Sequence, residues 1–502
     1  MTAPTMTGAV SQLRALAALR WQMVRAPGVR VGLCLSALLV LWLLRAAVGS
    51  ATALTPPALA ASLELAPAAF LGFGVLAVIA PLTAGGGSEM VPAAQLVAFP
   101  IRPRTQFLGG LLLAPINLVW VLQLLVLAAE TSYLTLSGHR AASGLTTTAY
   151  VLCLTVLGQA LAWTVVGLRQ SRAGRGLVSG AAAVGVLSVV AVVRGGYGDR
   201  VLAGSPTHIV VRALEEGPGR LWLVTTGSLL LAAAVGLAVG ARACGWALRR
   251  PAEVGATSAT EVRRRPGRRA VLAELVAVDR ASVWRAAALR RGGLVLALLP
   301  SLVALGAEVP WQSLVVLPGL VAAGAGLLFG VNAFCLDGSG ALWLASLPHD
   351  PMLLARSKLI VLTETVAAAT AIAAVTGSLR SPGVPTAAEL SGILTAALAG
   401  GTLVVATCLS LSVRRPHRAD LSGPRDAVAP PGALAAASAR LAVPAGLIGL
   451  LLEGATTTGR WWLPPLIGLP VVAAALLWLR RSLLAYSRPS VRARIVSTVA
   501  AG

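Results

Sequence analysis

Charged residues are scarce in this chain of 502 residues. They make up 12% of it, whereas 57% of the residues are hydrophobic and the mean hydropathy is +0.82. A soluble protein carries about twice that charged fraction, and a water-soluble fold could not cover so much apolar side chain with polar surface. The composition therefore excludes a soluble globular protein and predicts a chain embedded in a lipid bilayer.

Lysine is almost absent, since Lys358 is the only one among 41 basic residues. A P-loop needs a lysine directly after a glycine-rich turn to reach the phosphates of ATP. Lys358 instead follows Ala-Arg-Ser and opens an apolar run. We therefore expect that this chain is not an enzyme and holds no cofactor. If ATP drives it, the nucleotide and its Mg²⁺ belong to a partner subunit.

Cysteine and histidine are also few, with five and four residues. No CxxC pair occurs and no histidine lies near a cysteine, so the sequence indicates neither a metal site nor a disulfide framework. The net charge of +23 comes from arginines in short segments between apolar runs, which is typical of cytoplasmic loops. A nucleic-acid-binding protein would instead carry a basic face on a charged domain, so no nucleic-acid partner is expected.

Long apolar runs make up most of the sequence between the charged segments. A bilayer core of about 30 Å requires roughly 20 apolar residues per helix, and helices are the spanning structure that such runs allow. The sequence therefore predicts an all-α polytopic membrane protein with about twelve spans. These lie near 31–48, 66–87, 107–129, 147–168, 177–194, 221–243, 293–309, 313–335, 358–378, 388–411, 436–454 and 464–483.

Arginine is distributed unevenly between the two sets of loops. The N-terminal stretch, the segments near 102–104 and 169–175, and the linker 244–292 are rich in arginine, whereas the loop 49–65 has none. Because such residues favour the cytoplasmic side, both termini are predicted to be cytoplasmic. Arginine used in place of lysine, with much alanine, valine and glycine, favours a bacterial origin and hence the bacterial inner membrane.

The two groups of six spans resemble each other. A shift of 248 residues places Leu-Val-Ala-Phe-Pro-Ile-Arg-Pro (96–103) on Leu-Ala-Ser-Leu-Pro-His-Asp-Pro (344–351), and each half begins with an arginine-containing amphipathic stretch. The predicted organisation is therefore a first six-span half (1–248), a basic linker with the second amphipathic helix (249–292), and a second six-span half with a basic tail (293–502).

The two proline-bracketed segments are candidates for contact with a cytosolic protein. Proline ends a helix and fixes the chain direction, so a short charged element between two spans makes a suitable docking feature. The alternative is a tight turn that only reverses the chain. The candidate residues are Pro100, Arg102, Pro103, Arg104, Asp337, Pro348, His349, Asp350 and Pro351.

Polar residues within the predicted spans form a second set of candidates. Ionisable groups inside a membrane are costly and often functional. Glu364 could line a substrate path, although pairing with an arginine of a neighbouring helix is the favoured interpretation. Asn117 and Asn332 are expected to form hydrogen bonds between helices.

One segment resembles a known family. Asn332-Ala-Phe-Cys-Leu-Asp-Gly338, followed by Leu-Trp-Leu, a proline-bracketed turn and Leu-Leu-Ala-Arg-Ser-Lys358, is similar to the cytoplasmic coupling region of ABC-2-type exporter permeases. The resemblance implies a fused permease in which one chain supplies both halves of the pore. Its partners would be two copies of a cytosolic ABC ATPase, and its substrate an amphipathic molecule of unknown identity.

The same resemblance implies a coupling helix between the second and third spans of each half and short re-entrant helices between the fifth and sixth. The segment 195–220 could supply the latter in the first half, while the matching loop near 455–463 is too short. The first half also lacks the Asn-x-Phe part of the motif.

Two other functions stay open at this point. An ion-coupled secondary transporter would need acidic groups near the middle of the membrane and broken helices, for which Glu364 is one candidate. A polytopic membrane transferase is less favoured, because the outer loops offer few carboxylates or histidines.

Overall fold

The computed structural model of the chain describes most of its length. The described residues are 66–77, 102–113, 118–135, 139–195, 197–249, 271–286, 309–379, 381–419, 428–429 and 431–500, with scattered positions within 11–18, 38–45 and 289–296. These residues form helices and turns, and no strand occurs among them. The predicted all-α class is therefore confirmed.

Seven helical segments are long and apolar enough to cross a membrane. They are Arg140–Arg169, Arg220–Arg249, Trp311–Asp337, Met352–Ser378, Ala387–Arg414, Ala436–Thr456 and Leu463–Tyr486. Each coincides with a predicted span, and together they are compatible with a multi-pass membrane protein. The count of twelve stays a prediction. The spans near 31–48 and 293–309 lie mostly outside the described residues, and the helices described near 66–87, 107–129 and 177–194 are not among the seven candidates.

The chain divides into two compact units, residues 1–82 with 88–254, and residues 83–87 with 255–502. The division falls close to the predicted boundary at 248. Helix α12 (Val271–Arg285) packs with the helices of the second unit.

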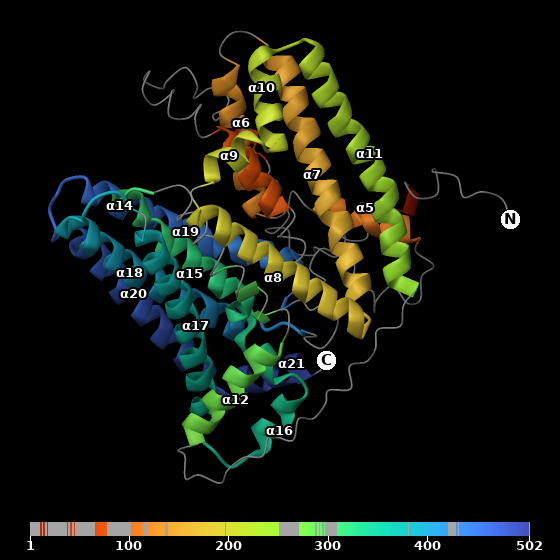
Figure 1. The fold of residues 1–502 in the computed structure, drawn as a ribbon. Helices are drawn as coiled ribbons and strands as arrows, with labels where there is room; N and C mark the ends of the chain where they lie inside the picture. The colour runs from red at the N-terminus through yellow and green to blue at the C-terminus, as the bar shows by residue number, and fades with distance from the viewer. Residues whose placement is uncertain are drawn as a thin grey trace. The chain divides into compact units, whose positions relative to one another are not determined.

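The first unit is built around two long antiparallel helices, α7 (Arg140–Arg169) and α11 (Arg220–Arg249), which pack along each other (Figure 1). Thr146 and Thr226 share a buried hydrogen bond of 2.8 Å between their hydroxyls. This bond joins the two helices, as expected for small polar residues in membrane helices. Around this pair lie α5 (Pro103–Leu113), α6 (Leu118–Leu134) and α8 (Arg172–Arg194).

Two short helices occupy the segment 195–220, where the sequence predicted short helical elements. They are α9 (Gly198–Ala203) and α10 (Pro206–Glu216). Val210, Val211 and Leu214 of α10 are buried against Phe70 and Tyr150, so this segment is part of the apolar core of the unit.

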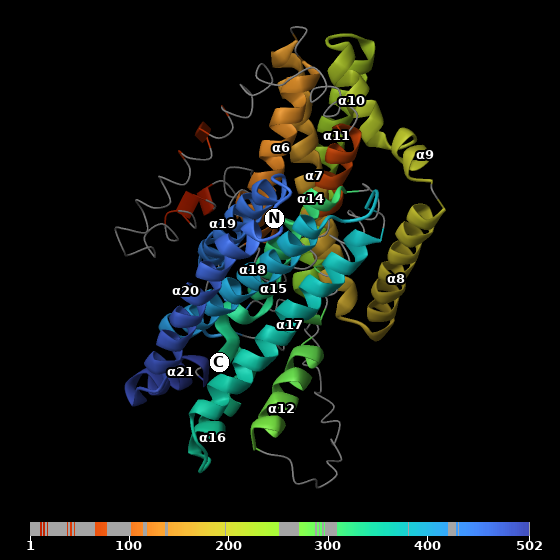
Figure 2. The same ribbon diagram turned by 90° about the vertical axis from the view of Figure 1, so that its left-hand side faces the viewer.

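The second unit is a helical bundle. Its elements are α14 (Trp311–Leu314), α15 (Leu317–Leu328), the 3₁₀ helix η4 (Gly330–Asp337), α16 (Gly340–Ser346), α17 (Met352–Ser378), α18 (Ala387–Arg414), α19 (Pro431–Thr456), α20 (Leu463–Tyr486) and α21 (Pro489–Ala500). Helices α15 and α18 lie at its centre, each in contact with α17, α19 and one another. Helices α12, α16 and α21 gather at one end of this unit (Figure 2).

The C-terminal segment, for which the sequence analysis predicted a basic tail, is helical. Residues Pro489–Ala500 form helix α21, whose Ile495 and Val499 are buried. The sequence contains the signal for it, because Pro489 is suited to the first helical position and Val491, Ile495 and Val499 recur every four residues.

Helices α15 and α18 approach closely through glycine. A Cβ added at Gly400 would lie 2.9 Å from the Cα of Gly319, so neither position has room for a side chain. Gly401, one residue later in the same helix, would bring its Cβ no closer than 3.8 Å to Val366. Small residues at helix crossings allow this kind of backbone contact in membrane proteins.

We therefore expect Gly400→Val to destabilise the second unit by about 1–3 kcal/mol, because overpacking forces the two helices apart. Gly401→Val is the matched control, since it carries the same loss of glycine within the same helix. Unfolding of the detergent-solubilised protein in a denaturant series measures the difference. Equal stability of the two variants would show that the Gly319–Gly400 contact does not set the helix spacing.

Candidate functional site

The span Trp311–Asp337 is broken inside the motif that the sequence analysis singled out. Helix α15 ends at Leu328, and Asn332 within η4 has the non-helical angles φ −143° and ψ 59°. The Asn332 side chain is fully buried. Its Nδ2 donates to the carbonyl oxygens of His417 at 2.7 Å and Val428 at 2.9 Å. Asn332 therefore ties the break to residues between α18 and α19.

A serine of the neighbouring helix satisfies the backbone groups that the break releases. Ser412 of α18 accepts a hydrogen bond from the Ala333 amide at 2.9 Å and donates to the Gly330 carbonyl at 2.8 Å. Non-helical backbone at membrane depth is tolerated where protein supplies such partners. The break is thus a built feature of the fold.

His417 lies beside this break in the segment after α18. Its backbone amide donates to Asn332 Oδ1 at 3.4 Å. Burial, together with the nearby charge of Arg415, lowers the pKa of the His417 imidazole below its usual value, so the neutral ring is favoured at neutral pH.

The single lysine of the chain is buried at the end of the broken span. Lys358 Nζ donates to Asp279 Oδ1 of α12 at 2.6 Å and to Asp337 Oδ1 at the end of η4. Ser357 also donates to Asp279 through its hydroxyl. Only 1% of the Lys358 side chain is exposed, and the two aspartates are 7% and 10% exposed. One ammonium thus joins three separate elements, α12, η4 and α17.

This cluster is costly to break. Removing one member of a buried ion pair leaves an unpaired buried charge, at a cost of about 3–5 kcal/mol. One ammonium against two carboxylates also leaves a formal charge of −1 in the cluster.

A second ion pair joins helices α12 and α17 at their surface. Arg280 of α12 donates through Nε to Glu364 Oε2 at 2.8 Å and through Nη2 to the other carboxylate oxygen. The hydrogen bond and charge of Glu364 raise the pKa of Arg280. Both side chains are about half exposed, so this pair contributes less than the buried cluster. The structure thus gives Glu364 an arginine partner on a neighbouring helix.

The proline-bracketed segment of the second half forms a compact turn before α17. The His349 amide donates to the Leu347 carbonyl at 2.9 Å, and Asp350 Oδ1 accepts from the Met352 amide at 2.9 Å. Asp350 therefore satisfies an amide at the start of α17, which is a structural role. Pro348 is exposed, and Pro351 directly precedes the helix.

Helix α16, just before that turn, exposes large apolar side chains. Leu342 is 60% exposed and Trp343 65%, and Leu347 adds a further 37% at the end of the helix. The opposite face holds Ala341, which is buried together with residues of α21. We call Leu342, Trp343 and Leu347 the α16 apolar face.

The corresponding segment of the first half is described only in part. Arg102 precedes α5, Pro103 is its first residue, and Arg104 is exposed in its first turn. Pro100 and Asn117 lie outside the described residues. The structure therefore brings Asn332, Asp337 and the 348–351 turn into one region of the second unit, whereas Arg102, Pro103 and Arg104 belong to the first unit.

Sequence analysis did not predict a site role for Lys358, and it missed Asp279, Arg280, Ser357 and Ser412. A signal exists for Asp279, because an aspartate within the apolar pattern of Val271–Arg285 calls for a buried partner. The only lysine of the chain, at the start of a span, is the complementary signal.

The comparisons with known proteins add no identification. No family model matches the chain, and searches of the curated proteins and of the solved structures found no match.

We expect Lys358→Met to lower the free energy of unfolding by about 3–5 kcal/mol, because it strands two buried carboxylates. The variant Lys358→Met/Asp279→Asn/Asp337→Asn should recover most of that loss, since it removes the charges together. Arg356→Met is the matched control, because Arg356 lies two residues away and is exposed; a change below about 0.5 kcal/mol is expected there. Denaturant unfolding in detergent measures all three, and equal losses for Lys358→Met and Arg356→Met would contradict the cluster's role.

Proposed function

We propose that the chain is the membrane subunit of an ATP-driven exporter, which couples to separate cytosolic ATPase subunits. The observation that carries the proposal is the arrangement at one end of the second unit. There a short helix with an exposed apolar face, α16, stands between two candidate spans and is joined to both of them through the motif Asn332–Gly338 and Lys358.

Rigid attachment of α16 supports this reading. Asp337 lies three residues before α16 and is held by Lys358 of α17, while Asp350 accepts a hydrogen bond from the first amide of α17. A force applied to α16 would therefore be transmitted to both candidate spans and, through Asp279, to α12. ATP binding on the partner could drive the membrane subunit between two states only through different contacts in each state, and α16 is placed to provide them.

The distribution of charge supports a cytoplasmic position for this end of the unit. This end of the unit is rich in arginine. The arginines lie at the ends of α18 and α20 and on α12, α17 and α21, namely Arg285, Arg356, Arg414, Arg415, Arg480, Arg481, Arg488, Arg492 and Arg494. The described residues at the opposite end include one arginine, Arg460, with Glu389 and Glu453. Basic residues favour the cytoplasmic side, so the orientation supports access of a cytosolic ATPase to α16. A bacterial inner membrane remains part of the proposal.

A secondary transporter is the second candidate, because the second unit contains a broken span and a buried cluster of one lysine and two aspartates. Such features occur at ion-coupling sites. Lys358, however, is only the seventh residue of α17, which places it roughly 9 Å from the start of a helix about 40 Å long. Its position near the helix end favours a structural joint over a coupling site at the membrane midplane.

Retention of an ATPase tests the proposal. We expect an ATPase to co-purify with the tagged wild-type protein in mild detergent, and Leu342→Ser/Trp343→Ser to reduce its amount at least about five-fold by removing the central contacts of the interface. These side chains are exposed, so the change should leave folding intact. The matched control is Leu379→Ser/Val384→Ser, which alters two exposed apolar residues after α17, at its other end (68% and 89% exposed).

An equal amount of ATPase on both double variants would show that α16 is not the docking element. Absence of any ATPase, together with uptake driven by an ion gradient, would instead favour the secondary transporter.

Orientation is tested separately by cysteine labelling in intact cells. With Cys34 replaced by alanine, the remaining cysteines (Cys153, Cys244, Cys335 and Cys408) are buried. We expect a membrane-impermeant maleimide to label Thr457→Cys, after α19, but not Ser490→Cys, in α21, until the membrane is opened. Both positions are exposed. The reverse pattern would place α16 outside the cell and remove the basis for coupling to a cytosolic ATPase.

A further inference from the structure

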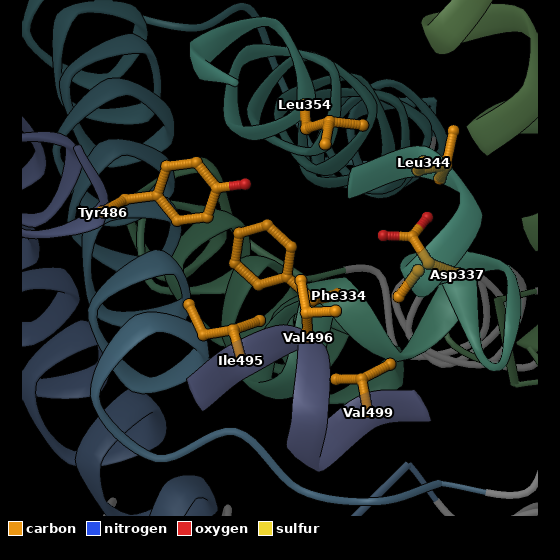
Figure 3. A pocket seen from close by; sticks show the side chains of 9 residues that line it. Phe334, Asp337, Leu344, Leu354, Tyr486, Ile495, Val496 and Val499 are labelled. Carbon is orange, nitrogen blue, oxygen red and sulfur yellow. The ribbon is translucent and has the colours of Figure 1, made fainter. Parts of the chain in front are cut away.

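A pocket opens beside the lysine cluster, at the end of the second unit that holds α16 (Figure 3). Helices α16, α17, α20, α21 and η4 contribute its walls. The pocket is a shallow hollow, since its free space of about 300 Å³ includes the part open to solvent. Every lining side chain is apolar except two, Asp337 and Tyr486. A pocket with apolar walls and a few convergent polar groups is the usual form of a ligand site.

The two polar groups face the same space from opposite walls (Figure 3). The Tyr486 residue is 4% exposed, and its hydroxyl forms no hydrogen bond with any described residue. Its ring stacks on Phe334 with centroids 5.2 Å apart and planes 4° apart, which fixes the direction of the hydroxyl. The hydroxyl oxygen is open to the pocket (Figure 3), so it can accept a hydrogen bond from a molecule that enters there.

Asp337 supplies the charge. Its Oδ1 accepts from Lys358, whereas Oδ2 receives no donor from the described part of the chain. The cluster of Lys358, Asp279 and Asp337 pairs one ammonium with two carboxylates, so its formal charge is −1. Arg492, the nearby cation on α21, instead donates to the Ser487 carbonyl at 2.8 Å. A cation that enters from the open side of the pocket would complement this carboxylate.

We propose that this pocket binds an alkylated cation, a guanidinium or an ammonium on an apolar chain. The charged head donates to Asp337 Oδ2 and to the Tyr486 hydroxyl oxygen, and the apolar chain contacts Leu344, Leu354 and Val499. Charge-assisted hydrogen bonds of this kind are the stronger ones. The site goes beyond ATPase docking at α16, and its ligand is either a basic side chain of a bound protein or a free amphipathic cation.

Butylguanidinium is a direct probe, and N-butylurea is its uncharged control of similar shape. Saturation-transfer NMR titrations of the detergent-solubilised full chain should show butylguanidinium binding at least about 10-fold more tightly, because the urea lacks the charge that pairs with Asp337. Tyr486→Phe retains the ring stack but removes the hydroxyl, and it should weaken binding about 5-fold through one lost hydrogen bond. Val499→Phe should abolish binding by filling the pocket.

Asp350→Asn is the matched control for charge, since it neutralises an exposed aspartate near α16 and should leave the affinity unchanged. Equal binding of the two probes, or unchanged butylguanidinium affinity in both Tyr486→Phe and Val499→Phe, would overturn the proposal.

ATPase retention then distinguishes the two sources of the cation. If a basic side chain of the ATPase occupies the pocket, butylguanidinium but not N-butylurea will displace the ATPase, and Tyr486→Phe will weaken its retention. If the ligand is a free cation, retention will not change while the probe still binds. Absence of an ATPase with intact probe binding would contradict the proposed function and leave the cation site standing.

Discussion

The second unit depends on one ammonium group. Lys358 joins the amphipathic helix α12, the end of the broken span η4 and the long helix α17 through two aspartates, in a site where all three side chains are at least nine-tenths buried. Charges so far from water are stable only when every partner is present. The cluster therefore fixes the positions of α12, η4 and α17 relative to one another, and with them the attachment of α16.

The other polar contacts extend this joint in two directions. Asn332 and Ser412 hold the break in the span against the end of α18 and the segment that follows it. Arg280 and Glu364 bind α12 to α17 at the surface. Ser412 provides hydrogen-bond partners for the backbone groups that the break leaves free, and Asp279 and Asp337 provide the carboxylates that the buried ammonium of Lys358 requires. The same end of the unit presents the α16 apolar face and the Asp337 pocket, so a ligand bound there would act directly on the joint.

Much of the fold could be predicted from the sequence, because apolar length alone decides which segments can cross a membrane. All seven candidate spans coincide with predicted ones. Helix α21 was missed because its apolar residues are few and lie among arginines, and their period of four is visible only once a helix is assumed. The break at Asn332 was also not predicted, since the glycine and asparagine there are equally compatible with a continuous small-residue helix.

The site was predictable in part. The motif Asn332–Gly338 and the turn 348–351 drew attention through their composition, and the structure places them together. Their partners Asp279 and Tyr486 lie 53 residues before Asn332 and 135 residues after Pro351, and no local pattern links such distant positions. Asp350, predicted to dock a partner because of its exposed charge in a proline-bracketed turn, also accepts a hydrogen bond from the amide at the start of α17; its role in docking stays a prediction.

Chemical modification of Lys358 tests the central claim most directly. The chain holds one lysine, so an amine-reactive ester can modify only that side chain and the N-terminal amine, which intact and peptide mass spectrometry distinguish. The account predicts that Lys358 stays unmodified in the folded wild-type protein, reacts fully after denaturation, and reacts much faster in Asp279→Asn/Asp337→Asn under native conditions. Rapid modification of Lys358 in the native wild-type protein would contradict the buried joint on which the rest of the structure depends.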